Sequence, residues 1–555
     1  MKHVTTGNGE VHNERTHSQT LHADSEHESS VGDNSVDSEQ SNDASGNDHP
    51  SWTNNIRQWL VPCFLLLLTG VILVVVLVPV LNRDYDGPRY KDAGFDVLQT
   101  RRSELCDCIE DPCYPSHLGR KVRLSGNGKL LFVLSGEFRV DDSTLEIWEE
   151  DGDEWELRNV YGRVNATSEA KGAGIRGDTF FVHDFAIDET GSRIIVSAMA
   201  KSYISSIVLV YERDPVEYQN KTFQFRKVGE SMNPFFLGLE KPPFDGMMNE
   251  GNLTSADGWG WSVSMSTDGN VIAVSAPKLD VPDQSYTDDR GEWDDLYNGG
   301  VVQAFQHART VTNENILDKF PNQTWVPKGQ LLVAERERRL FGQKVALAKN
   351  GDRLLATDGV DISYSDDSHG DIRVFNHDPD LGWVEKESVY VTSLREESDV
   401  FAVSSDGYLL VTGEANNNPS AYQEKPYRGE VKIYGYDDTE GRFKHLDTLQ
   451  GDEAFLHFGA SLAVSDEYTV VVGTGDTDLE RDIARVEIFE YSNTEWVHWV
   501  RNTPTVDISS SFAWASVDIS ADAKRIAGGV PSWDVRLECD TIYGHGFVGV
   551  YDYNN

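Results

Sequence analysis

The chain of 555 residues carries 92 Asp or Glu against 49 Lys or Arg, which gives a formal charge of −43 at pH 7. Neutralising nucleic-acid phosphates requires clustered Lys and Arg, so this balance excludes a nucleic-acid partner. Because 39% of the residues are hydrophobic and 10% are aromatic, a large core is available, which excludes collagen, a coiled coil and a wholly disordered chain.

Residues 1–59 are rich in Ser, Asn, Asp, Glu, Gly and His, and they contain almost no Ile, Leu or Phe. Such a segment cannot bury enough apolar surface to offset its chain entropy. We therefore predict a disordered acidic tail. Its spaced histidines are compatible with a simple solvating role or with weak metal binding or pH sensing.

Residues 60–81 (LVPCFLLLLTGVILVVVLVPVL) are 22 residues without a charge. As a helix this segment spans about 33 Å, at 1.5 Å per residue, and that length crosses a bilayer. The apolar block is too long and begins too far into the chain for a cleaved signal peptide. The sequence therefore predicts a transmembrane signal anchor, followed by a stalk over residues 82–118.

The orientation of this anchor depends on opposing signals. Five bases in residues 82–102 favour a cytosolic C-terminal side by the positive-inside rule. An even number of cysteines beyond the anchor suits disulfides in an oxidising compartment, and four Asn-x-Thr sequons are compatible with glycosylation there. We expect a single-pass protein with its C-terminal domain extracellular or lumenal, and a cytosolic scaffold is the alternative. The sequon asparagines are Asn165, Asn220, Asn252 and Asn322, and the cysteines are Cys106, Cys108, Cys113 and Cys539.

A turn followed by a short apolar strand recurs seven times beyond the stalk, at spacings of 55 to 82 residues. The turn positions are Gly128, Gly191, Gly269, Gly351, Gly407, Tyr468 and Ala523. Each complete unit has two further strands, such as 300–305 and 324–333 in the third unit. Four antiparallel strands in each of seven units predict an all-β fold, a seven-bladed β-propeller over residues 119–555.

The units share a consensus of Phe-Gly-x-x-Val/Leu, Ser-x-Asp-Gly, an apolar stretch and Gly-x-Val-x-Val-Phe. This consensus resembles the FG-GAP repeat of integrin α-chain-like propellers; Phe341-Gly342 and Phe458-Gly459 match literally, and Trp259-Gly260 matches nearly. WD-repeat propellers are the second choice, with a single matching dipeptide at Trp533-Asp534. The resemblance implies a recognition or adhesion module that binds protein or glycan ligands through its loop faces.

FG-GAP repeats often bind calcium through alternating carboxylates, and this chain departs from that pattern. In the third unit the equivalent positions are Ser264, Ser266, Asp268 and Ile272, which leaves one carboxylate, so we expect these turns to hold no metal. A weak calcium site is conceivable at one acidic loop that lacks a bending glycine, and we expect no other cofactor. Its carboxylates are Asp476, Asp478, Glu480 and Asp482.

The last unit ends after its third strand, so another segment must cover its edge. We expect residues 95–100 to supply that strand. Because the cysteine cluster follows this segment closely, we expect one disulfide from Cys539 to the cluster and one within it. Free thiols in a cytosolic domain, or a zinc site that includes His117, are the alternatives.

One loop insertion combines acidic and aromatic residues at a propeller rim, where loops often bind ligands. Such a loop suits a cation, a basic protein patch or a sugar, although a merely solubilising loop is the alternative. The candidate residues are Asp283, Tyr286, Asp288, Asp289, Trp293 and Asp294. We find no HExxH, GxSxG or P-loop motif. The rival function is a hydrolase or lyase that acts on surface polysaccharide with carboxylates in the central funnel.

Overall fold

The computed structural model divides into two compact units, Met1–Asp84 and Tyr85–Asn555, and every described residue belongs to the second. The described ranges are 89–92, 118–136, 143–152, 154–172, 180–200, 206–214, 224–232, 258–279, 281–287, 293–296, 299–335, 339–359, 370–391, 401–415, 429–451, 457–475, 483–492, 495–500, 506–507, 516–530, 535–536, 541–542 and 547–554. The predicted tail and anchor lie outside these ranges. Within them, no helix has the length and apolar character needed to span a membrane.

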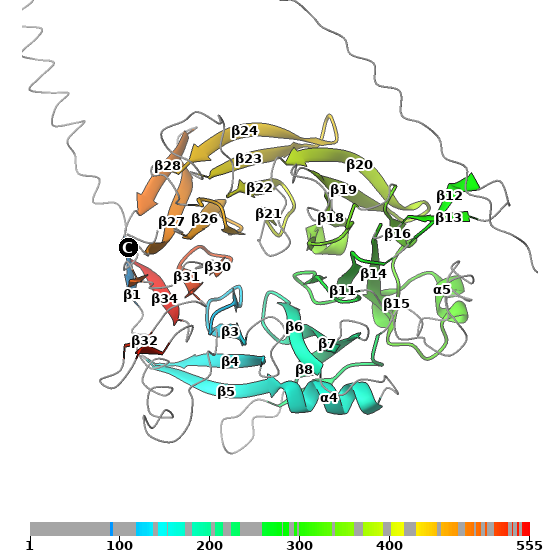
Figure 1. Cartoon of the computed structure of the whole chain (residues 1–555), viewed down its shortest axis with the longest axis horizontal. Coiled ribbons are helices and arrows are strands. Elements are labelled where there is room, and N and C mark those ends of the chain that lie inside the picture. The colour runs from blue at the N-terminus through cyan, green and yellow to red at the C-terminus, as the bar shows by residue number, and fades with distance from the viewer. Residues whose placement is uncertain are drawn as a thin grey trace, which may run out of the picture. The chain divides into compact units, whose positions relative to one another are not determined.

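Seven antiparallel sheets stand around a central axis as the blades of a propeller (Figure 1), which confirms the predicted fold class. The innermost strands, in blade order, are β2 (Lys121–Leu124), β6 (Phe180–Ile187), β10 (Val263–Met265), β17 (Val345–Ala348), β21 (Phe401–Val403), β25 (Ser461–Val464) and β30 (Ser516–Ile519). The second strands are β3 (Leu130–Ser135), β7 (Arg193–Ala200), β11 (Val271–Ala276), β18 (Arg353–Gly359), β22 (Leu409–Glu414), β26 (Thr469–Gly475) and β31 (Arg525–Val530).

The third strands are β4 (Thr144–Asp151), β8 (Ser206–Arg213), β14 (Val301–His307), β19 (Gly370–Asp378), β23 (Glu430–Asp437), β27 (Ile483–Ser492) and β34 (Phe547–Asn554). The outermost strands are β5 (Glu154–Gly162), β9 (Phe225–Lys227), β15 (Trp325–Pro327) with β16 (Leu332–Val333), β20 (Gly382–Val391), β24 (Arg442–Gln450), β28 (Glu495–Val500) with β29 (Val506–Asp507), and β1 (Arg89–Asp92). The fourth strand predicted in the third unit is thus two short strands, because Gly329 between them has a φ of 72° that interrupts the extended chain.

Smaller elements lie in the connections between these strands. They are the hairpin strands β12 (Val281–Thr287) and β13 (Trp293–Leu296), the pair β32 (Val535–Arg536) and β33 (Thr541–Ile542), the helices α4 (Arg163–Gly172) and α5 (Glu314–Lys319), and the 3₁₀ turns η2 (Ala308–Thr310) and η3 (Lys349–Gly351).

All seven predicted turn residues adopt a positive φ, between 54° and 80°. Five of them are glycine, which takes this conformation at little cost. Most of these turns begin with a serine, and its hydroxyl makes hydrogen bonds across the turn. In the third blade, Ser266 Oγ accepts from Val271 N at 2.9 Å and donates to Asp268 at 2.6 Å. The Ser-x-Asp-Gly motif is therefore a turn motif, and its carboxylate is hydrogen-bonded within the turn.

The core lies between neighbouring blades and is built on one repeated pair of positions. In every blade an aromatic residue of the third strand faces an aliphatic residue of the second. The pairs are Leu131↔Trp148, Ile194↔Tyr211, Ile272↔Phe305, Leu354↔Phe375, Leu410↔Tyr434, Val470↔Phe489 and Ile526↔Tyr551. The apolar alternation that predicted the strands is thus the alternation that fills the gaps between the sheets.

The seventh blade is completed from the N-terminal side of the propeller, as expected, but by a different segment. β1 pairs with β34 with Tyr90 opposite Tyr553, so the closing strand is Arg89–Asp92 and not residues 95–100, which lie outside the described residues. The prediction rests on position in the chain, before the first unit, and β1 lies a few residues earlier in the same segment. Outermost strands of this propeller can be rich in charged residues, as in β20 (GWVEKESVYV), so the charged sequence of β1 (RYKD) suits this place.

Hydrogen bonds between the seven inner turns tie each blade to the next, and we call this ring of turns the belt. The backbone bonds are Gly126 N to Glu189 O (2.5 Å), Glu189 N to Thr267 O (2.9 Å), Lys349 N to Ser405 O (2.6 Å), Asp466 N to Ala521 O (3.2 Å) and Ala521 N to Gly126 O (2.9 Å). Side-chain bonds complete it, from Thr267 Oγ1 to Asn350 Oδ1 (2.6 Å) and from Ser405 N to Asp466 Oδ1 (3.3 Å). The belt and the β1–β34 pair close the ring, whereas the four cysteines of the predicted disulfides lie outside the described residues.

Candidate functional site

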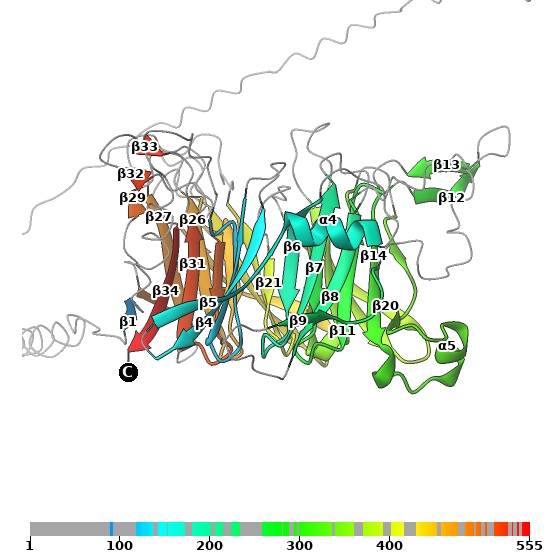
Figure 2. The same ribbon diagram turned by 90° about the horizontal axis from the view of Figure 1, so that it is seen from below.

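The two ends of the propeller differ in the length of their connections. Antiparallel pairing puts every turn between a first and a second strand at the belt, and these turns have four or five residues. We call this end the belt face and the opposite end the loop face. Connections that join strands at the loop face include 228–262 and 277–300. The belt face lies at the bottom of Figure 2, and α4 and the β12–β13 hairpin lie toward the opposite end.

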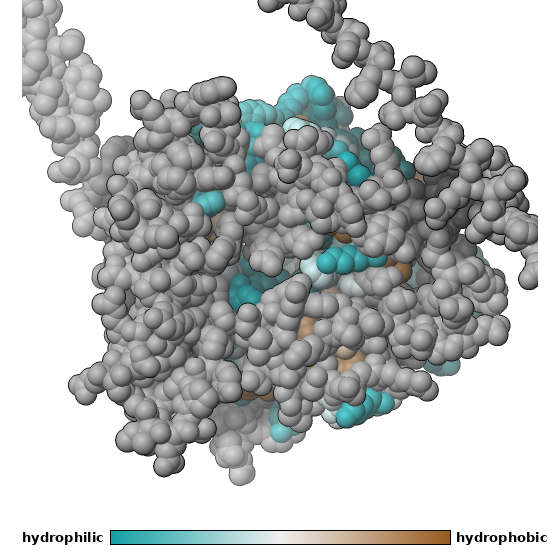
Figure 3. Space-filling model, in the orientation of Figure 1, coloured by the Kyte–Doolittle hydropathy of each residue, from teal (hydrophilic) through white to brown (hydrophobic). Residues whose placement is uncertain are grey.

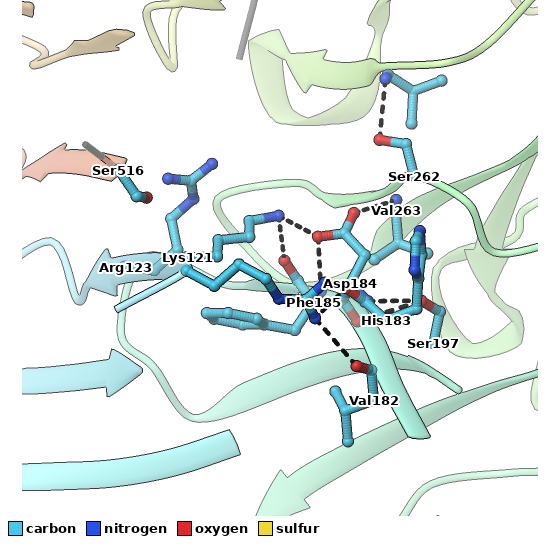
Figure 4. A network of polar contacts seen from close by, with 12 residues as sticks. Lys121, Arg123, Val182, His183, Asp184, Phe185, Ser197, Ser262, Val263 and Ser516 are labelled. Atoms are coloured by element: carbon cyan, nitrogen blue, oxygen red, sulfur yellow. Dashed lines mark hydrogen bonds and ion pairs between the residues drawn. The ribbon is translucent and has the colours of Figure 1, made fainter. Parts of the chain in front are cut away.

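A single carboxylate on β6 joins the inner strands of three blades (Figure 4). The pairing of β6 with β7 shifts register between Val182 and Asp184. The Asp184 carboxylate accepts from Lys121 Nζ of blade 1, from its neighbour Phe185 N at 2.9 Å, and from Val263 N of blade 3 at 2.9 Å. The side chain of Asp184 is 12% exposed, so this network is a buried junction.

Serine and aspartate side chains make similar contacts at other blade junctions. The innermost strand is the edge of its sheet, so its N–H groups that face away from the sheet need partners outside it. The donors and acceptors are Val122 N to Ser516 Oγ (3.1 Å), Leu124 N to Asp518 Oδ2 (2.6 Å), Val345 N to Ser262 Oγ (3.2 Å), Leu347 N to Ser264 Oγ (2.9 Å) and Val517 N to Ser461 Oγ (3.1 Å). These polar residues therefore hold the ring together.

An aromatic and cationic cluster lies beside the Asp184 junction. The ring of His183 is 5.0 Å from that of Trp261, and Lys278 Nζ lies 4.5 Å from the same indole. Arg120 donates to the carbonyls of Val182 and His183 at 3.2 and 3.1 Å. Burial, together with the charge of Arg120, lowers the pKa of His183 to about 3. The imidazole is therefore neutral near pH 7 and poorly matched to acid–base catalysis there.

The described carboxylates do not form the pair that a glycosidase-like mechanism needs at the channel. Burial raises the pKa of the carboxyl groups of Glu387 and Glu490, but these residues lie on β20 and β27, away from the innermost strands. The described innermost strands hold two carboxylates, Asp184 and Asp518, and both accept hydrogen bonds from a neighbouring blade. Within the described ranges, no cluster of three His, Cys, Asp or Glu could hold a metal ion.

The structure brings four of the six predicted ligand-binding residues together on one hairpin. Asp283 and Tyr286 lie on β12, and Trp293 and Asp294 lie on β13; the two strands pair with a register shift. The hairpin stands at the outer edge of blade 3 (Figures 1 and 2). Asp288 and Asp289 lie outside the described residues, as do the predicted calcium residues Asp476, Asp478, Glu480 and Asp482.

Two of the four sequon asparagines belong to the described part of the chain, and both are exposed. Asn165 Oδ1 accepts from Gly162 N at 3.3 Å, which resembles a capping box at the start of α4. Asn322 occupies a turn with a φ of 68°. Asn220 and Asn252 lie outside the described ranges.

Sequence reasoning missed both the Asp184 junction and a cavity between blades 1 and 2. One signal was present: Asp184 stands where the third, sixth and seventh units have Ser262, Ser461 and Ser516. The cavity left no sequence signal, because it depends on how two blades meet. In Figure 3 the described surface shows hydrophilic residues near the middle of the ring and along its rim, with smaller hydrophobic areas between them.

No protein-family model matches this chain, and no curated protein matches it. Among solved structures, hydrazine synthase of Kuenenia stuttgartiensis aligns at 11% identity over 78% of this chain and 98% of its own, with a TM-score of 0.41. A putative 6-phosphogluconolactonase from Bacteroides fragilis aligns at 12% identity (68% and 82%, TM-score 0.37), and the periplasmic gluconolactonase of Pseudomonas aeruginosa at 11% (72% and 88%, TM-score 0.37). Similarities this low carry no argument about function.

Proposed function

We propose that this chain is a single-pass membrane protein whose propeller is an extracytosolic recognition module, and that its loop face binds a basic protein partner. The observation that carries this proposal is the asymmetry of the two faces. The turns between first and second strands at the belt face have four or five residues each, and the longest connection at that end is 308–324, whereas connections of up to 35 residues join strands at the loop face. A rigid scaffold with long connections at one face is the usual architecture of a binding surface.

Charge favours a basic partner. The connection 277–300, which includes the β12–β13 hairpin, contains seven acids and two bases. Residues 360–369 contain three acids and no base, and residues 476–482 contain four acids and one base. All three connections follow a second strand and therefore leave their blades at the loop face. Negative charge gathered at one face attracts a basic protein surface and speeds its association.

The point where the chain enters the propeller is consistent with this assignment. β1 begins at Arg89, which pairs with Asn554, and this end of the outermost strand of blade 7 lies at the belt face. The predicted anchor precedes β1 in the chain. The loop face is at the opposite end of the blades from the start of β1.

The rival function, a hydrolase or lyase that acts on surface polysaccharide, requires a pair of free carboxylates near the channel. Both carboxylates on the described innermost strands are instead engaged in contacts between blades. Those contacts favour recognition over catalysis at this position.

The test compares binding of a ten-residue Lys/Arg-rich peptide by the full-length protein in lipid nanodiscs and by two charge variants. The first variant changes Asp288, Asp289, Asp294 and Asp295 to Asn. The matched control changes four exposed acids near the belt face, Glu154, Glu314, Asp318 and Asp380, to their amides. We expect affinity to fall about tenfold in the first variant and less than twofold in the control.

Equal losses in the two variants would show that only overall charge matters, which contradicts a binding surface on the loop face. Failure of the wild-type protein to bind the basic peptide more tightly than a Glu-rich peptide would also contradict the proposal. Measurement at two salt concentrations separates the variants further, since screening weakens exposed charge contacts.

A further inference from the structure

A cavity of about 290 Å³ lies between the outer strands of blades 1 and 2. Strands β4 and β5 form its wall on the side of blade 1, and β7, β8 and β9 form its wall on the side of blade 2. Helix α4 follows β5 directly in the chain and contributes Asn165, Ser168 and Glu169 to the lining. The cavity therefore lies on the side of the propeller, away from the central channel and from the β12–β13 hairpin.

One residue that lines the cavity differs from its counterparts in blades 3 and 4. Trp325 at the start of β15 donates its indole N–H to Val228 O of blade 2 at 3.2 Å, and Trp383 of β20 donates to Lys328 O of blade 3 at 2.7 Å. Both tryptophans are almost fully buried, at 0% and 3% exposure. The corresponding residue of β9 is Phe225, which is smaller and has no N–H group, and it is only partly buried.

The inner part of the cavity combines aliphatic side chains with two phenols. Leu145 and Ile147 of blade 1 and Ile194 and Val196 of blade 2 supply the aliphatic side chains. The phenols belong to Tyr161 and Tyr211; their hydroxyls lie 3.1 Å apart and their ring centroids 5.2 Å apart. Tyr211 is the aromatic residue that every third strand places in the core, so its ring is held by the fold.

The polar groups of the cavity carry no net charge. Lys227 Nζ pairs with Glu169 at 2.9 Å and donates to Ser231 Oγ at 2.6 Å. Burial raises the pKa of Tyr161 and that of Tyr211 well above the usual value of a phenol. Both hydroxyls therefore stay protonated at any physiological pH, and they can donate to or accept from a neutral ligand.

We propose that this cavity is a binding site for a neutral carbohydrate of one or two rings. A sugar ring has an apolar face of C–H groups and an edge of hydroxyls. The tyrosine rings and aliphatic side chains match the face, and the phenols, Asn159 and Ser168 match the edge. The volume is near the lower end of the range for small-molecule sites, roughly 300–1,000 Å³, which suits a ligand of this size. The inference does not depend on the loop-face proposal.

The experiment titrates methyl glycosides of common hexoses, together with lactose and maltose, into the full-length protein in lipid nanodiscs, which avoids sugar-based detergents. Ligand-observed saturation-transfer NMR detects binding and calorimetry measures the dissociation constant. We expect at least one sugar to bind saturably with a Kd of about 1 mM, typical of a small ligand held by a few contacts. A parallel arm uses 4-hydroxyphenylacetamide, a neutral hydroxyaromatic compound.

Three variants locate the site. Phe225→Trp reproduces the tryptophan of blades 3 and 4 and fills the cavity, so we expect at least a tenfold loss of affinity without loss of stability. Tyr161→Phe combined with Tyr211→Phe removes the hydroxyl pair, and we expect a similar loss. Tyr434→Phe is the matched control, because Tyr434 holds the place of Tyr211 in blade 5 and should leave affinity unchanged.

The proposal is wrong if no sugar of the panel binds saturably, or if Phe225→Trp and the double Tyr variant bind the sugar as tightly as the wild-type protein does. It is also wrong if only the hydroxyaromatic compound binds, because the cavity would then select an aromatic ligand instead of a carbohydrate. Urea unfolding of each variant shows whether a loss of binding reflects a loss of folding.

Discussion

Asp184 shows how one side chain can accept hydrogen bonds from backbone N–H groups that have no partner within their own sheet. The inner edge of a blade has no further strand, so its N–H groups must find partners in the neighbouring blade. The Asp184 carboxylate accepts hydrogen bonds both from Val263 N of the next blade and from Lys121 Nζ of the preceding blade. Elsewhere a serine hydroxyl suffices, as at Ser262. A carboxylate is needed where a lysine must also be neutralised in a buried position.

His183 beside this junction makes the stability of the propeller depend on pH. Its folded-state pKa of about 3 lies below the value near 6.5 of an unfolded histidine, so protonation favours the unfolded chain. Stability is intact above about pH 6.5 and falls, by up to about 1.4 kcal/mol per pH unit, as the pH drops toward 3. Burial also lowers the pKa of His307 and that of His377, which adds to the same trend.

The measurement is urea unfolding between about pH 7 and about pH 4. We expect His183→Gln to remove much of the acid-side loss of stability. His445→Gln, a change at an exposed histidine on β24, should keep the wild-type profile. A His183→Gln profile parallel to that of the wild type would show that the imidazole is not held neutral by its surroundings.

At the scale of single elements, the turn between the first two strands of each blade requires one residue with a positive φ, in the left-handed region. Gly407 has a φ of 75°, and a Cβ there would lie 3.3 Å from Ala348 Cβ. We therefore expect Gly407→Ala to lower the free energy of unfolding by about 1–2 kcal/mol. Gly172→Ala at the end of α4 is the control, because a Cβ there meets no atom within 4 Å. Urea midpoints compare the two variants, and equal midpoints would contradict the strain argument.

The inner half of each blade could be predicted from the sequence, whereas parts of the outer half could not. The turn residues and the apolar second strand are fixed by local conformation and by burial on both faces, so their pattern recurs in all seven units. The outermost strands differ widely in length and composition, from β9 (FRK) to β20 (GWVEKESVYV), and their pairing depends on the neighbouring strand. This difference explains the wrong choice of residues 95–100 over β1. The cavity depends on Phe225 facing another blade, a contact between sheets that no local pattern encodes.

At the scale of the whole molecule, the propeller is closed by contacts spread around the ring. The belt reaches from Ala521 to Gly126 across the last junction, and Arg525 of blade 7 donates to Gly128 O of blade 1 at 3.0 Å. Arg193 and Arg353 make the same contact with the turn of the following blade. The ring therefore has hydrogen bonds across its closing junction that do not involve a disulfide, in either a reducing or an oxidising compartment.

Which compartment holds the propeller decides which partners it can meet, and the sequons offer a direct measurement. We expect the full-length protein from its native membranes to shift in gel mobility after N-glycosidase treatment, and we expect the shift to disappear when all four sequon asparagines are changed to Gln. Glycosylation requires an accessible acceptor in an extracytosolic compartment, and both Asn165 and Asn322 are exposed. The absence of a shift, with Cys106 and Cys539 freely alkylated, would instead place the propeller in the cytosol. The acidic loop face would then serve a cytosolic scaffold, as the bases of residues 82–102 suggest.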